Sequence, residues 1–152
     1  MIVPRFYSSQ HDPAANAMVG EFVSHVIWKD GRGFSPFCSM GVWDGPDLIA
    51  GVIYHSTNED TGVIELSAGS VSQRWMTPQV LRMMFGIPFD LLGVQMVMHR
   101  VSGANANMLS QMRRFGHSEY VIPRLAGRET DGHVFTLTDD QWRAHRLYIT
   151  PK

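Results

Sequence analysis

The segment from residue 65 to residue 116 constrains the fold most, because it reads as strand, polar loop, helix, strand and helix. The first strand is Ile64-Glu65-Leu66-Ser67, the loop covers 70–76, and Thr77-Pro78 opens the first helix. A helix that begins directly after a strand presents free backbone N–H groups and a positive dipole end, which bind phosphate groups. The segment therefore predicts a βαβα unit that holds a nucleotide-like cofactor.

The rest of the chain predicts a sheet and short helices around this unit. Apolar residues in the helical period follow Asp12-Pro13, and a turn separates two apolar runs before residue 56. These patterns predict a mixed α/β (α+β) fold with a mostly antiparallel sheet. The elements expected outside the segment are a helix over 13–27, strands over 38–43 and 48–55, strands over 118–122 and 133–137 joined by a connection at 124–132, and a short final helix after the capping box Thr138–Gln141.

Length and composition indicate a single domain over residues 1–152. The formal net charge of −1 does not favour bulk attraction to nucleic acid. Cys38 stands alone, so no intrachain disulfide is expected and a reducing cytoplasm is the natural compartment. No apolar run is long enough for a membrane helix, so we expect no membrane partner. The histidines form no i,i+4 pair, and we therefore expect no metal site.

Several short motifs follow one another in a recognisable order. Phe89-Asp-Leu-Leu-Gly-Val comes first, Asn105 stands eleven residues before Gly116, and Arg124, Asp131 and Asp140-Gln141-Trp142 close the series. Over about residues 38–142 this order resembles the GNAT superfamily of acyl-CoA-dependent N-acetyltransferases. The loop around Arg74 and the pair Pro88-Phe89 look most like the branch often carried by phages and prophages.

The resemblance implies a GNAT-type mixed, mostly antiparallel twisted sheet flanked by helices. It implies that acetyl-CoA is the acyl donor and that the acceptor is an unidentified primary amine on a small molecule or peptide. A homodimer through an open strand edge is a further hypothesis. The acceptor would be chosen by the N-terminal helix and by the segments 29–37 and 124–132.

The resemblance also assigns roles to particular residues. The thioester would lie along the strand at Leu66, Ser67 and Ala68. The pyrophosphate would meet the backbone amides from Arg74 through Trp75 and Met76 to Thr77, with help from the Arg74 guanidinium. Asn105 would either contact the pantetheine arm or cap its own helix.

The catalytic groups are open to two interpretations each. Glu65 is the candidate base because it lies on the strand beside the thioester; the alternative is a strand-edge carboxylate that faces solvent. Tyr120 is the candidate proton donor, or an ordinary packed tyrosine. His55, His99 and His117 are further base candidates, although a strand histidine is often only a packed residue.

The departures from the family pattern leave a second function open. Trp75 and Thr77 stand where the family's loop carries glycine and a second small residue, and Met112 stands where many members carry a tyrosine acid. The chain could therefore be an enzyme, or a degenerate GNAT-fold protein that no longer binds acyl-CoA and acts as a binding or structural module. The enzyme hypothesis requires that the Trp75 indole turns away and that the amides at 74–77 are free and face a crevice.

Overall fold

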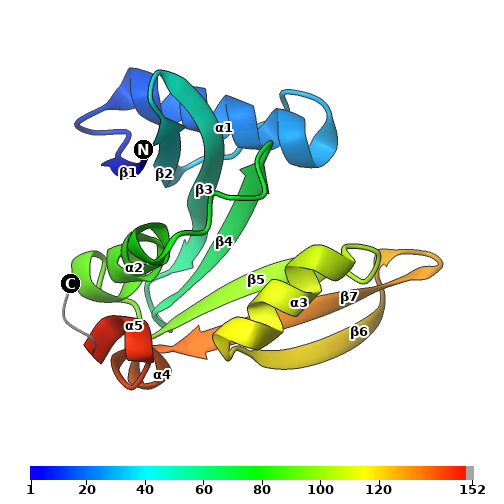
Figure 1. Ribbon diagram of the computed structural model, residues 1–152. Coiled ribbons are helices and arrows are strands. Elements are labelled where there is room, and N and C mark those ends of the chain that lie inside the picture. Colours follow the sequence, from blue (N-terminus) through cyan, green and yellow to red (C-terminus); the bar gives the residue numbers. More distant parts are fainter. Residues whose placement is uncertain (150–152) are drawn as a thin grey trace.

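The structure, a computed structural model, describes residues 1–149 and consists of one seven-stranded sheet with helices on both faces (Figure 1). The strand order is β1-β2-β3-β4-β5-β7-β6, and every neighbouring pair is antiparallel except β4 and β5. The predicted mixed, mostly antiparallel sheet flanked by helices is therefore confirmed. The strands are β1 (Ile2–Tyr7), β2 (Phe37–Asp44), β3 (Asp47–Asn58), β4 (Val63–Ser70), β5 (Met96–Ser102), β6 (Ser118–Gly127) and β7 (Thr130–Thr138).

Alternate side chains along each strand separate the core into two layers. On one face, α1 (Pro13–Trp28) buries Val19 and Val23 against Ile53 of β3. On the other face, neighbouring residues such as Tyr54 and Leu66 pack with the remaining helices. Those helices are α2 (Pro78–Gly86), its π-helical continuation η1 (Ile87–Leu91), α3 (Ala106–Phe115), α4 (Asp139–Arg143) and α5 (Arg146–Ile149).

The parallel pair in the middle of the sheet is short. Val63–Leu66 of β4 pair with Met96–His99 of β5, and the pairing stops there. Beyond this point β4 continues along β3 as far as Ser70, whereas β5 continues along β7 as far as Ser102. The two strands therefore diverge, and Figure 1 shows them separating between α1 on one side and α3 on the other.

Local sequence signals placed most helix ends correctly. The Asn105 side chain caps α3 by accepting from the Met108 N–H at 3.2 Å, and Gly116 ends the same helix with φ of 109°. The capping box at the start of α4 is present. Asp12 occupies the N-cap of α1, but its side chain makes no capping hydrogen bond.

Two parts of the sheet differ from the prediction. β1 was not expected, because Pro4 interrupts the apolar pattern; proline is tolerated here because β1 is an edge strand that pairs only with β2. The connection expected at 124–132 is largely hairpin, since β6 runs to Gly127 and β7 begins at Thr130. An irregularity in register between Ile122 and Gly127 hides this continuation from a simple alternation test.

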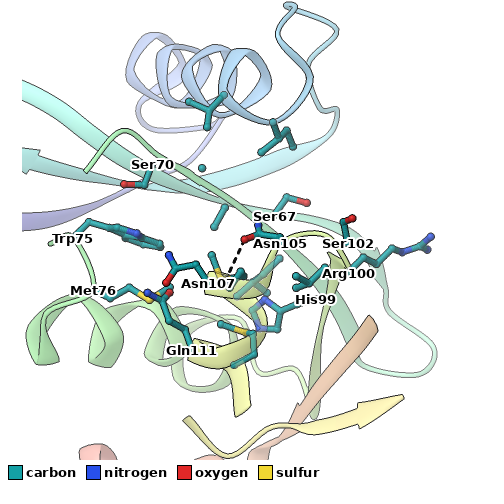
Figure 2. A pocket seen from close by; sticks show the side chains of 18 of the residues that line it. Ser67, Ser70, Trp75, Met76, His99, Arg100, Ser102, Asn105, Asn107 and Gln111 are labelled. Atoms are coloured by element: carbon teal, nitrogen blue, oxygen red, sulfur yellow. Dashed lines mark hydrogen bonds between the residues drawn. The ribbon is translucent and has the colours of Figure 1, made fainter. Parts of the chain in front are cut away.

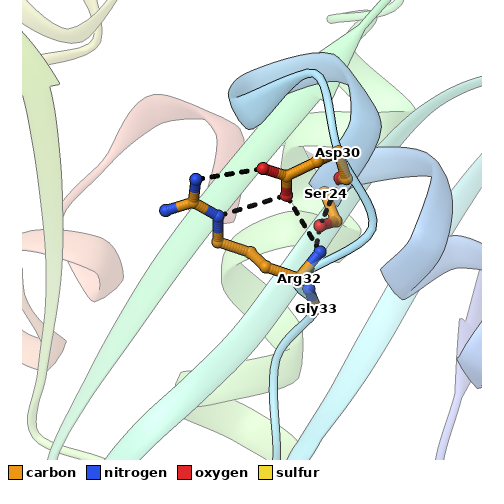
Figure 3. A network of polar contacts seen from close by, with 4 residues as sticks. All are labelled: Ser24, Asp30, Arg32 and Gly33. Carbon is orange, nitrogen blue, oxygen red and sulfur yellow. Dashed lines mark hydrogen bonds and ion pairs between the residues drawn. The ribbon is translucent and has the colours of Figure 1, made fainter.

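The loop after α1 is fixed by a small polar network (Figure 3). The Ser24 hydroxyl donates to the Asp30 carbonyl and accepts from the Gly33 N–H, each at 2.9 Å. The Arg32 guanidinium pairs with the Asp30 carboxylate at 3.0 Å. Phe34 follows this network in the chain and packs against the sheet, where its ring centroid lies 5.1 Å from that of His55.

The far edge of the sheet carries apolar side chains. β6 is the terminal strand, and Tyr120, Val121, Ile122 and Leu125 on it are between 39% and 57% exposed. The expected homodimer stays a prediction. Within residues 1–149, no helix has the length and apolar character to cross a bilayer, and no three His, Cys, Asp or Glu side chains gather in a way that could hold a metal ion.

Candidate functional site

A cavity of about 770 Å³ opens where β4 and β5 diverge. Both strands lose their mutual hydrogen bonds there, so the cavity is bordered by strand edges as well as by side chains (Figure 2). Its lining comes from the end of α1 (residues 26–28), β4 and the loop after it (66–73), Trp75, Met76, Met84, β5 (99–102) and α3 with its cap (Asn105, Asn107, Met108, Gln111, Met112).

Most of the residues predicted to hold the acyl donor meet at this cavity. The strand residues Leu66, Ser67 and Ala68 line it. Trp75 and Met76 line it as well, and so does Asn105. The structure thus brings together six of the eight predicted binding residues, whereas Arg74 and Thr77 are not among the lining residues.

The Trp75 indole forms a wall of the cavity. The side chain is only 4% exposed and packs in the main hydrophobic core. Figure 2 shows the indole beneath β4, on the same side as Met76. The cavity remains open beside it, so a tryptophan at this position does not close the space between the strands.

The expectation that all four amides at 74–77 are free is wrong for two of them. The Arg74 N–H donates to the Ser72 hydroxyl at 3.2 Å, and the Thr77 N–H donates to the Trp75 carbonyl at 3.0 Å. Thr77 is instead the N-cap of α2, and its hydroxyl accepts from the Val80 N–H. Within residues 1–149, the N–H groups of Trp75 and Met76 have no hydrogen-bond partner.

The two predicted catalytic residues lie outside the lining. Glu65 is on β4 directly before Leu66, and its carboxylate is held by the Arg100 guanidinium at 3.3 Å. Its side chain is 13% exposed. Tyr120 lies on the edge strand β6, is 57% exposed, and is not among the residues that line the cavity.

A histidine reaches the cavity through a serine. His55 Nε2 lies 2.8 Å from the Ser67 hydroxyl, and His55 Nδ1 lies 2.9 Å from the Ser56 hydroxyl. Burial of the ring lowers the pKa of His55, while nearby Glu65 opposes this and Arg100 adds to it. The imidazole is therefore uncharged at neutral pH.

A second pair of histidines, His99 and His117, lies at and behind the lining of the cavity. His99 lines the cavity, is 5% exposed, and has its pKa lowered well below the usual value, chiefly by burial. His117 lies behind it, and burial lowers its pKa to about 4. Within residues 1–149, the Nε2 atoms of both rings and Oε1 of Gln111 are buried without a hydrogen-bond partner.

Sequence reasoning missed several polar residues of the lining, notably Arg100, Asn107 and Gln111. One signal was available: Asn107 and Gln111 are spaced i,i+4 and so share a helix face beside the apolar stripe of α3. No comparable signal marks Arg100, because its access to the cavity depends on the divergence of β4 and β5.

The comparisons with known proteins support the fold. No protein-family model matches the sequence, and no curated protein matches it. Solved structures do match: a mutant form of the spermidine/spermine N-acetyltransferase SpeG from Vibrio cholerae gives a TM-score of 0.73 at 10% identity and covers 95% of this chain and 98% of its own. A GCN5-related N-acetyltransferase from Brucella melitensis gives 0.67 at 16% identity, with 97% of this chain and 79% of that one covered.

A GNAT-family protein from Chromobacterium violaceum gives a TM-score of 0.63 at 18% identity, with 93% of this chain and 89% of that one covered. The chain therefore has the GNAT fold. Nothing in these three matches supports the narrower prediction of a phage branch, which stays a prediction.

Proposed function

We propose that the protein is an acetyl-CoA-dependent N-acetyltransferase that transfers an acetyl group to a primary amine. The observation that carries the proposal is the divergence of β4 and β5 after Leu66 and His99, with a cavity of about 770 Å³ at that point. The cavity is large enough for an extended ligand arm, and it lies at the gap between the strands.

The edge of β4 supplies polar groups for an acyl donor. Within the described residues 1–149, no strand pairs with Ser67 or Ala68 on the side of β5, so this edge is available to hold a thioester oxygen. The unpartnered N–H groups of Trp75 and Met76 precede α2, whose positive dipole end favours a phosphate. Acetyl-CoA, when bound, would supply an activated acyl group to this edge.

Glu65 and Tyr120 lie at different distances along the sheet from the β4 edge, so they take different parts in the proposed reaction. Glu65 lies next to the proposed thioester edge and is tied to Arg100, so it acts through the charge that it places there. Tyr120 lies on the outer strand, and the proposal therefore leaves protonation of the departing thiolate to solvent at the mouth of the cavity. The acceptor is an amine on a small molecule or a peptide.

Calorimetry with acetyl-CoA tests the proposal directly. We expect saturable binding in the micromolar range at roughly 0.1 mM protein. Release of free CoA thiol should rise when a primary amine is added. An absence of heat at this concentration would contradict the proposal.

A second candidate function rests on the same loop. Trp75 stands in the wall of the cavity, and two of the four predicted amides are bonded within the chain. Met112 is buried and lines the cavity together with His99, at a position where many family members carry a tyrosine. A GNAT-fold binding or structural module would show no acyl-CoA binding, and light scattering on the same sample would test the predicted homodimer.

A further inference from the structure

We propose that His55, acting through the Ser67 hydroxyl, is the base that removes a proton from the acceptor. This inference rests on the proposed function, because it assigns the proton transfer in the same reaction. It gives the reaction a base that reaches the cavity through Ser67, which lines the cavity, whereas Glu65 is not among the lining residues and has no such contact with one of their hydroxyls.

The register of the sheet brings the two residues together. His55 of β3 lies directly opposite Glu65 of β4, so Ser67 is its diagonal neighbour on the same face. The Ser67 hydroxyl lies 2.8 Å from His55 Nε2, and Ser67 lines the cavity where β4 loses its pairing with β5. Figure 2 shows the Ser67 hydroxyl among the residues around this opening.

A bulge holds the imidazole in place. The pairing of β3 with β4 is irregular between His55 and Asn58, and Ser56 in this irregularity has φ of 54°. A non-glycine residue in the left-handed region costs on the order of 1 kcal/mol and persists only where surrounding structure fixes it. The Ser56 hydroxyl lies 2.9 Å from His55 Nδ1. With the proton on Nδ1 donated to Ser56, Nε2 is free to accept from Ser67.

The groups that face His55 suit a base that is neutral before the reaction and charged during it. Phe34 covers one side of the imidazole, with ring centroids 5.1 Å apart. The charged groups nearby are Glu65 and Arg100, which are paired with each other at 3.3 Å. Burial keeps the ring unprotonated at neutral pH, and the Glu65 carboxylate favours the imidazolium once it forms.

The proposed step transfers the acyl group to the amine and one proton to His55. The amine nitrogen forms a bond to the thioester carbonyl carbon, and the carbon–sulfur bond breaks with its electron pair on sulfur. The nitrogen loses one proton to Ser67 Oγ while the Ser67 hydroxyl proton passes to His55 Nε2. The proton on His55 then returns to solvent, and the thiolate takes one proton from solvent.

The test compares Ser67→Ala and His55→Gln with the wild-type protein and with His11→Gln, an exposed histidine in a turn that serves as the control. The probes are acetyl-CoA with water alone and acetyl-CoA with a panel of primary amines (an aliphatic monoamine, a diamine, an amino-acid ester and a short peptide). Calorimetry gives the affinity for acetyl-CoA, and a thiol reagent gives the rate of CoA release from pH 5 to 9.

We expect both variants to bind acetyl-CoA within about threefold of wild type while kcat falls roughly 100-fold. The wild-type rate should fall as the pH drops and His55 becomes protonated, with a midpoint below pH 6.5. This fall in rate should be absent in His55→Gln. Ser67→Thr should restore most of the rate because it keeps the hydroxyl. The control should match wild type.

The outcomes of this test distinguish a failure of the proton relay through Ser67 to His55 from a failure of the proposed function. An absence of acetyl-CoA binding in the wild type overturns the proposed function and the relay with it. Normal binding overturns the Ser67–His55 relay alone if CoA is released and His55→Gln keeps the wild-type rate and pH profile. Normal binding without release of CoA to any amine of the panel, at any pH, overturns the acetyl transfer and the relay with it.

Discussion

The imidazole rings of His99 and His117 meet edge to face, with 4.9 Å between their centroids. Both rings are buried in an aromatic cluster with Phe85, and neither Nε2 has a hydrogen-bond partner within residues 1–149. A charge on either ring would be poorly solvated and would face the other ring. The pair therefore links the folding of this region to pH.

We predict that the free energy of unfolding falls as the pH drops from 6.5 towards 4. The folded-state pKa of His117 is about 4, below its ordinary value of 6.5, so the unfolded chain binds more protons in this window and stability is lost as pH falls. His117 alone accounts for about 3 kcal/mol when the pH has fallen below 4. His99 acts in the same direction.

Urea unfolding at a series of pH values checks this prediction, with His117→Phe as the variant that should flatten the slope. Glu119 also makes stability depend on pH, but it does so in a different pH range from the histidines. Hydrogen bonds from Arg113 and His133 lower the pKa of Glu119 to about 2, so its contribution is lost only below pH 4.5. If the free energy of unfolding of His117→Phe fell with pH as steeply as that of the wild type, the assignment to His117 would be wrong.

Asn105 provides a test of capping against ligand contact. Asn105→Asp keeps the oxygen that accepts from Met108 N–H, whereas Asn105→Ala removes it. We expect Asn105→Ala to lower stability by about 1 kcal/mol and Asn105→Asp to leave it nearly unchanged. If the amide also contacts the acyl donor, acetyl-CoA affinity will fall in both variants. Equal affinity in Asn105→Asp and wild type would show that the residue is only a cap.

Two glycines should respond in opposite ways to alanine. A Cβ at Gly51 would lie 2.7 Å from Val19 Cγ1 and 2.8 Å from Val23 Cγ2, where α1 packs on β3. We expect Gly51→Ala to destabilise the protein by about 1–3 kcal/mol through overpacking.

Gly86→Ala is the matched control, because its Cβ would meet only Asp90 Oδ2 at 3.6 Å and the residue is helical. Alanine is the better helix former, so a gain of about 0.5 kcal/mol is expected there. Thermal unfolding of both variants measures the difference, and a stabilised Gly51→Ala would show that α1 does not approach β3 as closely as described.

Trp75 should report ligand binding by its fluorescence. Trp28 and Trp75 both line the cavity, whereas Trp142 is buried in the core away from it. We expect acetyl-CoA to quench the emission and Trp75→Phe to remove much of that quenching. Phenylalanine is the chosen replacement because glycine at a 4% exposed core position would cost about 3–5 kcal/mol. Unchanged quenching in Trp75→Phe would assign the signal to Trp28.

The sequence predicted those features that depend on neighbouring residues. The caps at Asn105 and Thr138 and the stop at Gly116 depend on hydrogen bonds within a few residues, and all three are present. The strand–helix alternation between residues 63 and 115 was predicted for the same reason.

The features that depend on register were not predictable in this way. Ser67 meets His55 only because β3 and β4 pair with Glu65 opposite His55. The use of the Arg74 and Thr77 amides within the loop depends on a backbone path that the residue types leave open. Arg100 reaches the cavity only because β5 leaves β4 after His99.

The short seam between β4 and β5 has a mechanical consequence. Within the described sheet, β1–β4 are joined to β5–β7 by only four residue pairs. The sheet therefore consists of two halves that meet along a narrow hinge. A molecule bound in the cavity beyond this hinge contacts both halves of the sheet and restricts their movement relative to each other. Amide hydrogens on β4 and β5 should then exchange more slowly together, even where the bound molecule lies far from them.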